Sequence, residues 1–181
     1  MIIGLTGTNA AGKTSVVKYF VARGFKYYSL SDAIRKELTE RGQEHSRDNL
    51  RRVGNELRRL FGAAILAKRI RRQISSPNVV IDSIRNVSEV KELRKLKHFV
   101  LLAIDAPIEI RFERASARGR IENAPTIEKF IELEELEKSI DKTAQNIDQC
   151  MKLADYFVYN DGTKEDLIKK IEKIVSELSS K

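Results

Sequence analysis

The sequence predicts an α/β fold in which a five-stranded parallel sheet lies between layers of helices. Short apolar runs, rich in β-branched and aromatic residues, alternate along the chain with stretches of helical periodicity. The apolar runs are continuous instead of alternating with polar residues, which is typical of strands buried on both faces of a parallel sheet. The 181 residues contain no repeats and no proline- or glycine-rich linkers, so we expect a single domain.

The expected elements follow one another in a regular order. The predicted strands are Ile2–Thr6, Tyr27–Leu30, Val79–Ile81, Phe99–Ile104 and Tyr156–Tyr159. Helical stripes separate them, and the clearest consists of Leu167, Ile168, Ile171, Ile174, Val175 and Leu178. Residues 32–76 and 106–153 are helical without an intervening strand, the second stretch being interrupted around Gly119–Pro125. We interpret both stretches as insertions on the parallel-sheet core.

Charge is unevenly distributed along the chain. Residues 35–72 contribute +7 of the formal net charge of +8, because they hold twelve Lys and Arg but only five Asp and Glu. Such a segment favours a polyanionic partner, either nucleic acid or a small phosphorylated molecule, or it forms a solvated helix face.

No apolar run approaches the roughly 20 residues that a bilayer requires, and no secretory signal is visible, so no membrane partner is expected. A single cysteine, Cys150, excludes an internal disulfide and indicates a cytoplasmic location.

The strongest local signal is a phosphate-binding motif at the first strand–helix junction. Residues 7–14 read G-T-N-A-A-G-K-T and match G-x-x-x-x-G-K-[ST] at every fixed position. Backbone N–H groups of such a loop surround a phosphate, and the following helix adds the positive end of its dipole. We expect Lys13 to reach the β- and γ-phosphates and the Thr14 hydroxyl to bind Mg²⁺. The predicted ATP contacts in this loop are Gly7, Asn9, Ala10, Ala11, Gly12, Lys13, Thr14 and Ser15.

A nucleoside triphosphate site does not by itself define a reaction. Three classes of protein compete: a small-molecule kinase, a GTP-dependent switch and a nucleic-acid-linked ATPase. The sequence lacks the N-K-x-D tetrapeptide with which GTP switches usually read guanine. A nucleic-acid-linked ATPase usually needs a longer chain. Small size and a basic helical insertion after the second strand therefore favour a kinase.

Further segments resemble those of the nucleoside monophosphate kinase family, in the same order along the chain. Residues 31–35 (S-D-A-I-R) resemble G-D-M-L-R, and residues 82–85 (D-S-I-R) resemble D-G-F-P-R. Residues 113–118 (E-R-A-S-A-R) resemble D-R-x-x-x-R at the entrance to the lid. Residues 160–163 (N-D-G-T) resemble the loop that passes the donor adenine. The chain is most similar to the adenylate-kinase-related branch and to the kinase-like domain found beside deoxycytidylate deaminases, with dephospho-coenzyme A kinase a more distant relative.

The resemblance implies a role for each of these segments. Arg35 and Arg85 would hold the phosphate of the acceptor nucleotide, and Asp82 would steer Mg²⁺ through water. Arg114 would lie on the donor base and Arg118 on the transferring phosphates. The remaining implied contacts are Ser31 and Asp32 on the acceptor side, and Gly162 and Thr163 on the donor side. Arginine suits these roles because its planar fork binds phosphate oxygens and stays charged.

The resemblance also implies how the domain is divided. The fold is expected to be the three-layer P-loop NTPase fold, with its core at residues 1–31, 77–105 and 154–181. A helical insertion that binds the acceptor would occupy about residues 32–76, and a short lid about residues 114–142. Catalysis is assigned to Lys13, Arg85, Arg114 and Arg118, since phosphoryl transfer needs positioning and positive charge more than a side-chain base.

The acceptor side leaves two questions open. The expected helix over residues 48–61 has an apolar row at Leu50, Val53, Leu57, Leu60 and Phe61 and a polar row at Arg51, Arg52, Asn55, Arg58 and Arg59. The polar row is either solvated or lines the acceptor pocket, with Arg51, Asn55 and Arg58 as candidate contacts. No aromatic residues interleave with its arginines, so nucleic-acid stacking is not favoured. Glu89 stands where adenylate kinases carry a glutamine that reads the acceptor adenine, and it either reads a base edge that offers donors or favours the first turn of a helix.

One segment departs from the family pattern. The residues after the lid entrance are acidic, at Glu122, Glu128, Glu132, Glu134, Glu135, Glu137 and Asp141. A negative strip does not by itself stabilise a phosphoryl group. Either Arg118, Arg120 and Lys142 suffice for catalysis, or the lid is short and has another role.

The sequence therefore predicts ATP- and Mg²⁺-dependent phosphoryl transfer to a nucleoside monophosphate, with AMP or a deoxynucleotide as first choice. One alternative is a dephospho-coenzyme A kinase, whose hydroxyl acceptor needs a general base, for which Asp32 is the candidate. The other is a nucleotide-binding regulator associated with nucleic acid. Small-molecule nucleotides are thus the expected partners, and the oligomeric state stays open.

Overall fold

The computed structural model of the chain describes residues 1–119, 124–136 and 145–180. Its strands form one sheet in the order β2-β3-β1-β4-β5, and every neighbouring pair is parallel. They are β1 (Ile2–Thr6), β2 (Lys26–Ser29), β3 (Val79–Asp82), β4 (Phe99–Asp105) and β5 (Tyr156–Tyr159). The predicted five-stranded parallel sheet is confirmed, and each strand end lies within one residue of its expected position.

Leu30 was expected in the second strand but begins helix α2 (Leu30–Glu40). The reason is a helix cap, because the Ser29 hydroxyl accepts a hydrogen bond from the Ser31 N–H at 3.2 Å. A serine in this position satisfies one of the free N–H groups at the start of the helix. The chain thus passes from β2 directly into the first of the inserted helices.

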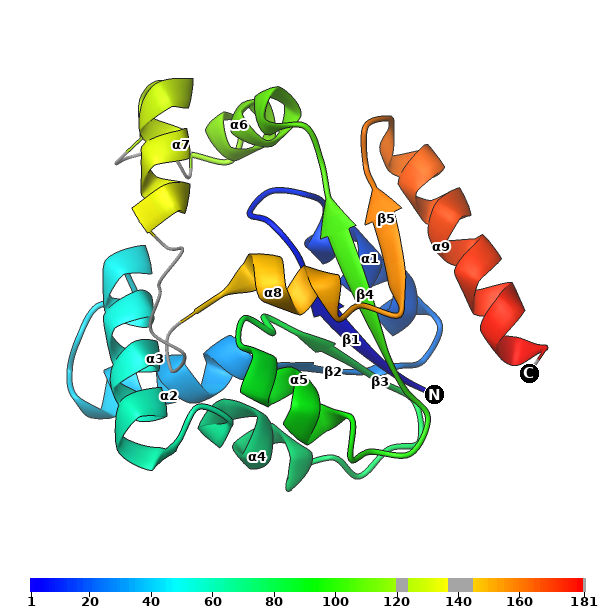
Figure 1. The fold of residues 1–181 in the computed structure, drawn as a ribbon, viewed down its shortest axis with the longest axis horizontal. Helices are drawn as coiled ribbons and strands as arrows, with labels where there is room; N and C mark the ends of the chain where they lie inside the picture. Colours follow the sequence, from blue (N-terminus) through cyan, green and yellow to red (C-terminus); the bar gives the residue numbers. More distant parts are fainter. Residues whose placement is uncertain (120–123, 137–144, 181) are drawn as a thin grey trace.

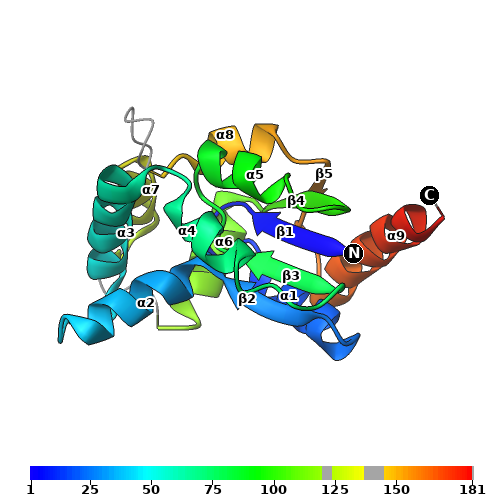
Figure 2. The same ribbon diagram turned by 90° about the horizontal axis from the view of Figure 1, so that it is seen from below.

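Helices cover both faces of the sheet (Figures 1 and 2). On one face, α1 (Lys13–Ala22) and α9 (Lys164–Ser179) share a core with Ile3 and other strand residues. On the opposite face, α5 (Val87–Leu93) and α8 (Ile147–Lys152) share a core with Ile2 and its neighbours. Successive strand residues point to opposite faces, so a continuous apolar strand supplies both cores.

The stretch between β2 and β3 folds into α2, α3 (Arg47–Phe61) and α4 (Ile65–Arg71). These helices extend the core that lies over α5, to which Ile34, Val53 and Leu57 contribute. α2 and α3 approach closely, since a Cβ on Gly54 would lie 2.9 Å from the Ile34 side chain. The stretch is helical without a strand, as the sequence predicted.

Helices α6 (Ile108–Ser116) and α7 (Ile127–Leu136) lie together beyond the carboxyl end of β4 (Figure 1). The rings of Phe112 and Phe130 join them at a centroid distance of 5.9 Å. Ala10, in the loop between β1 and α1, packs against the same small cluster. The two helices are therefore in contact with the loop that carries the phosphate-binding motif. Within the described ranges, no helix is both long enough and apolar enough to cross a membrane.

Candidate functional site

The loop between β1 and α1 has a conformation that its glycines make accessible. Gly7 has φ 126° and Gly12 has φ 113°, in the region that favours glycine. A Cβ on Gly7 would lie 1.9 Å from the carbonyl oxygen of Ile104, and a Cβ on Gly12 would lie 2.5 Å from Nδ2 of Asn160. Both glycines of the motif are thus needed for the loop to pack closely on the ends of the neighbouring strands.

Lys13 lies across this loop. Its Nζ donates hydrogen bonds to the carbonyl oxygens of Gly7 at 2.7 Å and Thr8 at 2.5 Å. Burial lowers the pKa of Lys13 to about 8; Asp82 and Glu134 oppose this shift, whereas Arg85 and Arg111 add to it. The ammonium group therefore lies among groups of both signs, and an anionic ligand in the loop would favour its protonated form.

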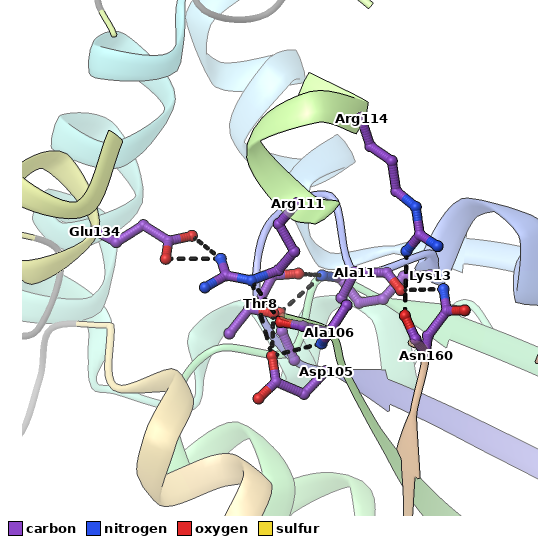
Figure 3. Close-up of polar contacts among 10 residues, drawn as sticks. Thr8, Ala11, Lys13, Asp105, Ala106, Arg111, Arg114, Glu134 and Asn160 are labelled. Carbon is purple, nitrogen blue, oxygen red and sulfur yellow. Dashed lines mark hydrogen bonds and ion pairs between the residues drawn. The ribbon is translucent and has the colours of Figure 1, made fainter. Parts of the chain in front are cut away.

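Two aspartates end the strands on either side of β1. Asp82 ends β3, and its Oδ1 accepts a hydrogen bond from the Ser83 N–H at 2.6 Å. Asp105 ends β4, and its Oδ1 accepts hydrogen bonds from the Thr8 hydroxyl at 2.6 Å and the Ala106 N–H at 2.9 Å (Figure 3). Both lie at the carboxyl edge of the sheet, where open α/β sheets bind their ligands.

A metal ion would have to bind at this edge with help from its ligand. Among the described residues, no group of three His, Cys, Asp or Glu side chains could hold a metal on its own. The Thr14 hydroxyl is exposed at the start of α1, and Asp82 is half-buried at the end of β3. One hydroxyl and one carboxylate fit the way Mg²⁺ binds beside nucleotide phosphates, which complete its coordination together with water.

Glu89 and Arg58 are both fully buried in this structure, in contrast to the acceptor contacts expected from the sequence. They form a buried ion pair, with Glu89 Oε1 2.9 Å from Arg58 Nε and 2.8 Å from Arg58 Nη2. The other carboxylate oxygen, Oε2, accepts the N–H groups of Arg85 and Asn86 at 2.9 and 3.0 Å. Because the exposed fractions of Arg58 and Glu89 are 1% and 0%, neither can meet an acceptor base without a rearrangement. Their position instead fixes the turn that carries Arg85.

The amphipathic interpretation of α3 also needs correction at its carboxyl end. Val53 and Leu57 are buried as expected, but Leu60 and Phe61 are exposed although they belong to the predicted apolar row. Arg58, from the predicted polar row, is buried because α3 faces the β3–α5 turn as well as α2. Asn55 accepts a hydrogen bond from Arg58 Nη1 at 3.4 Å, so this candidate is also next to the buried pair.

Three of the remaining acceptor candidates, Ser31, Asp32 and Arg35, lie in the first two turns of α2. Asp32 and Arg35 are both exposed and bind each other, with a distance of 2.7 Å between Asp32 Oδ1 and Arg35 Nη1. Ser31 is half-buried beside them. Arg85, in the turn after β3, donates from Nη1 to Gln145 Oε1 at 3.2 Å. Arg35 thus comes from the inserted helices and Arg85 from the sheet core.

A pocket of about 200 Å³, the candidate donor-base pocket, is lined by Gly12, Ser15, Arg114, Arg118, Asn160, Lys164 and Leu167. It thus includes Arg114 of the predicted donor-side residues but neither Gly162 nor Thr163. Arg114 donates to the carbonyl oxygen of Gly162 at 3.1 Å, and burial together with the nearby Arg118 lowers its pKa. The Thr163 side chain caps α9 in a reciprocal arrangement with Asp166, so its hydroxyl is already bonded. The structure therefore brings together Arg114, Arg118 and Gly12 around one pocket, whereas Gly162 and Thr163 follow its lining residue Asn160 two and three positions later in the chain.

Sequence reasoning missed several residues of this site. Asp105 ends a strand just as Asp82 does, so the same rule could have identified it. Asn160 donates from Nδ2 to the Ala11 carbonyl oxygen at 2.7 Å, while its buried Oδ1 has no hydrogen-bond partner within the described part of the chain. Arg111 and Glu134 form an ion pair beside Asp105, and their separation in sequence follows no recognisable spacing. Of the charged residues discussed for the lid, Arg120, Glu122, Glu137, Asp141 and Lys142 lie outside the described residues.

Comparisons with known proteins agree with this fold. A family model described as an AAA domain matches residues 3–140. The UPF0200 protein of Thermococcus gammatolerans is 34% identical, over 98% of this chain and 95% of its own length. The UPF0200 protein of Pyrococcus horikoshii is 35% identical, over 99% of this chain and 98% of its own length.

Solved structures of kinases share the fold at low sequence identity. The shikimate kinase of Bacteroides thetaiotaomicron has a TM-score of 0.62 at 15% identity, covering 97% of this chain and 98% of its own. The shikimate kinase of Aquifex aeolicus has a TM-score of 0.56 at 18% identity, covering 99% of this chain and 98% of its own. At such identities the likeness shows the fold, which is that of P-loop kinases. Together, the family match and the full-length relatives show that this chain belongs to the UPF0200 family and that its residues 3–140 form a member of the AAA domain family.

Proposed function

We propose that this protein transfers the γ-phosphoryl group of ATP, with Mg²⁺, to a nucleoside monophosphate. The observation that carries the proposal is that two positively charged side chains, Lys13 and Arg85, lie near each other at one edge of the sheet. Lys13 lies across the phosphate loop, and Arg85 comes from the end of the adjacent strand near enough to lower the pKa of Lys13. A donor phosphate in the loop and an acceptor phosphate at Arg85 would then face each other, as in-line phosphoryl transfer requires.

Mg²⁺ would be held by the Thr14 hydroxyl and, through water, by Asp82. When bound, the ion supplies charge neutralisation between the phosphates. The chain's own residues do the positioning. The loop N–H groups and Lys13 orient the donor, Arg114 and Arg118 line the donor-base pocket, and Arg85 orients the acceptor. Glu89 and Arg58 hold the Arg85 turn from the interior.

A hydroxyl acceptor is the second candidate, as in dephospho-coenzyme A kinase, and the solved structures with this fold include shikimate kinases. The candidate base for such a reaction, Asp32, binds Arg35 at 2.7 Å. This ion pair would have to open before Asp32 could take a proton from a hydroxyl group. We therefore favour a phosphate acceptor, for which Arg35 would exchange the carboxylate of Asp32 for a phosphate and no base is needed.

A nucleic-acid-associated regulator has less support from the basic segment than the charge count suggested. Three of the arginines in residues 35–72 bind carboxylates from outside this segment, in the pairs Arg35–Asp32, Arg58–Glu89 and Arg71–Glu92. Part of the excess positive charge of the segment is thus compensated within the fold. Fewer of the segment's cations are available for the phosphate contacts that give nucleic-acid binding its affinity and its salt dependence.

The test is a coupled phosphoryl-transfer assay with ATP and Mg²⁺ against all ribo- and deoxynucleoside monophosphates and dephospho-coenzyme A. We expect turnover of one nucleoside monophosphate. Lys13→Ala should reduce this turnover by about 100-fold or more, because the lysine contacts the transferring group, while the variant keeps its fold by circular dichroism. Turnover of dephospho-coenzyme A alone would favour the hydroxyl acceptor. ATP binding without turnover of any acceptor would contradict the proposal.

A further inference from the structure

Arg111 is a nearly buried arginine that lies between the end of β4 and helix α7. Its Nε donates to the Ala106 carbonyl oxygen at 3.0 Å, and its Nη1 donates to both carboxylate oxygens of Glu134, at 2.5 and 2.7 Å (Figure 3). The exposed fraction of its side chain is 8%. Neither the motif nor the family resemblance assigned a role to this arginine; the resemblance identified Arg114 on the same helix and Arg118 just after it.

The Arg111–Glu134 pair is connected to the phosphate loop. Arg111 Nε lies 4.0 Å from Asp105 Oδ1, the atom that accepts the Thr8 hydroxyl. Thr8 in turn provides one of the two carbonyl oxygens that bind Lys13 Nζ. The apolar cluster of α6 and α7 reaches the same loop at Ala10. Arg111 is thus next to the first residues of the loop, where the terminal phosphate of a nucleotide would lie beside Lys13.

The ion pair itself is one that an anionic ligand can displace. Both oxygens of Glu134 share the single nitrogen Nη1, so the carboxylate does not use the two parallel hydrogen bonds that make arginine–carboxylate pairs strongest. The Glu134 side chain also keeps an exposed fraction of 16%, so the carboxylate can turn toward water without becoming a buried, uncompensated charge. A phosphate group offers arginine more acceptor atoms and more negative charge than a carboxylate does.

We propose that Arg111 is a further phosphate-binding arginine of this site, and that Glu134 holds its guanidinium until the terminal phosphate of a bound nucleotide replaces the carboxylate. The acidic character of α7, which the phosphate chemistry left unexplained, then has one defined use. Glu134 compensates a buried arginine while no nucleotide is bound. The inference rests on the proposed function only through ATP binding and does not depend on the acceptor.

The experiment measures dissociation constants for ATP and ADP with Mg²⁺ by calorimetry at pH 7, without an acceptor. Glu134→Gln should lower the dissociation constant for ATP by roughly three- to tenfold, since the phosphate no longer competes with a carboxylate. ADP, which lacks the terminal phosphate, should change by less than about twofold. Arg111→Gln should raise the dissociation constant for ATP about tenfold, the value of one charge-assisted hydrogen bond.

The combined variant, Arg111→Gln with Glu134→Gln, decides whether the tighter ATP binding expected for Glu134→Gln depends on Arg111. We expect it to bind ATP as weakly as Arg111→Gln alone. A gain that persists without Arg111 would overturn the proposal, because it would be a general effect of removing negative charge. Weaker ATP binding by Glu134→Gln would also overturn it, since Glu134 would then support the structure of the site and would not compete with the phosphate.

Glu132→Gln is the matched control, because it removes the same charge from the same helix at an exposed pair with Lys129. It should change ATP binding by less than about twofold, owing to solvent screening. If Arg111→Gln does not fold, Arg111→Lys keeps the charge without the planar fork and should give an intermediate loss. Absence of ATP binding to the unmodified protein would overturn both this inference and the proposed function. ATP binding without phosphoryl transfer would contradict the proposed function alone.

Discussion

Two arginine–glutamate pairs support the candidate site, one behind the turn that carries Arg85 and one beside the phosphate loop, and they differ in what surrounds them. In the pair Arg58–Glu89, the exposed fractions of the side chains are 1% and 0%, and both oxygens of Glu89 are bonded, one to the arginine and the other to backbone N–H groups. In the pair Arg111–Glu134, the exposed fractions are 8% and 16%, and both oxygens of Glu134 accept from one arginine nitrogen. The first pair is enclosed, whereas the second lies at the edge of the site.

This difference indicates different uses of the same chemistry. Opening an enclosed pair leaves a charge without compensation in the interior, which costs several kcal/mol, so such a pair fixes geometry. Opening the pair at the edge lets the carboxylate turn toward water while an anionic ligand compensates the arginine, so such a pair can exchange partners. On the acceptor side, the enclosed pair would keep Arg85 in place. On the opposite side, the terminal phosphate of a bound nucleotide would replace Glu134 as the partner of Arg111.

The largest expected effect is on the free energy of unfolding when the enclosed pair is broken. Glu89→Gln should destabilise the protein by about 3–5 kcal/mol, because Arg58 is left as a buried charge and one turn loses its cap. Glu134→Gln should cost less, about 1–2 kcal/mol, since Asp105 lies 4.0 Å from the nearly buried Arg111 and the amide oxygen of glutamine can still accept a hydrogen bond from it. Urea unfolding followed by circular dichroism measures both values on the same scale.

Replacing both members of the enclosed pair provides the control for this prediction. Arg58→Met combined with Glu89→Gln removes the unpaired charge, so part of the lost stability should return. Equal costs for Glu89→Gln and Glu134→Gln would show that enclosure does not distinguish the two pairs. The comparison on which both assignments depend would then fail.

Much of the fold and one part of the site could be predicted from the sequence, because those features are local. A strand, a glycine-containing loop and a helix follow one another in residues 2–22, so their pattern can be recognised in the sequence alone. The end of a strand is also local, which is why Asp82 was recognised and Asp105 could have been. Continuous apolar strands gave the parallel sheet because two cores need two buried faces.

The two ion pairs could not be predicted in this way, because they join residues that only the tertiary fold brings together. Arg58 and Glu89 are 31 positions apart, and Arg111 and Glu134 are 23 positions apart. Helical periodicity assigned Arg58 to a polar face, and a polar face usually lies in solvent. Periodicity does not show that a second element covers that face and brings a carboxylate to the arginine.

The second largest expected effect is on the pH dependence of ATP binding. It tests whether the charge of Glu134 affects the pKa of Lys13 in the phosphate loop. The free protein holds Lys13 with a pKa of about 8, and phosphates bind the protonated form. ATP affinity should therefore be constant below pH 8 and fall up to tenfold per pH unit above it, as one proton must be taken up on binding. Calorimetry from pH 6.5 to 9.5 measures this dependence.

Variants of the two pairs should shift this pH dependence differently. The charge of Glu134 raises the pKa of Lys13, so in Glu134→Gln the loss of affinity should begin at a lower pH than in the unmodified protein. Glu132→Gln, on the same helix, should leave the midpoint in place. A midpoint that stays at pH 8 in Glu134→Gln would show that this carboxylate does not act on the loop.

The smallest expected effect concerns Ser83, in the turn that the enclosed pair holds. Ser83 has φ 66°, a conformation that costs a non-glycine residue about 1–2 kcal/mol, and it stands where the family pattern D-G-F-P-R has glycine. Ser83→Gly should be neutral within about 1 kcal/mol. The relief of strain is offset by greater freedom of the unfolded chain and by loss of the hydrogen bond from the Ser29 hydroxyl to the Ser83 hydroxyl at 3.2 Å.

Ser83→Val is the informative counterpart, because a β-branched residue is poorly compatible with positive φ. If the Arg58–Glu89 pair fixes the turn, the backbone cannot move to relieve valine, and the variant should lose roughly 1–2 kcal/mol more than Ser83→Gly in urea unfolding. Equal stability of the two variants would mean that the turn changes conformation at little cost. In that case the turn that carries Arg85 would change conformation as readily as the Arg111–Glu134 pair exchanges partners. Enclosure of an ion pair would then not by itself make the neighbouring backbone rigid.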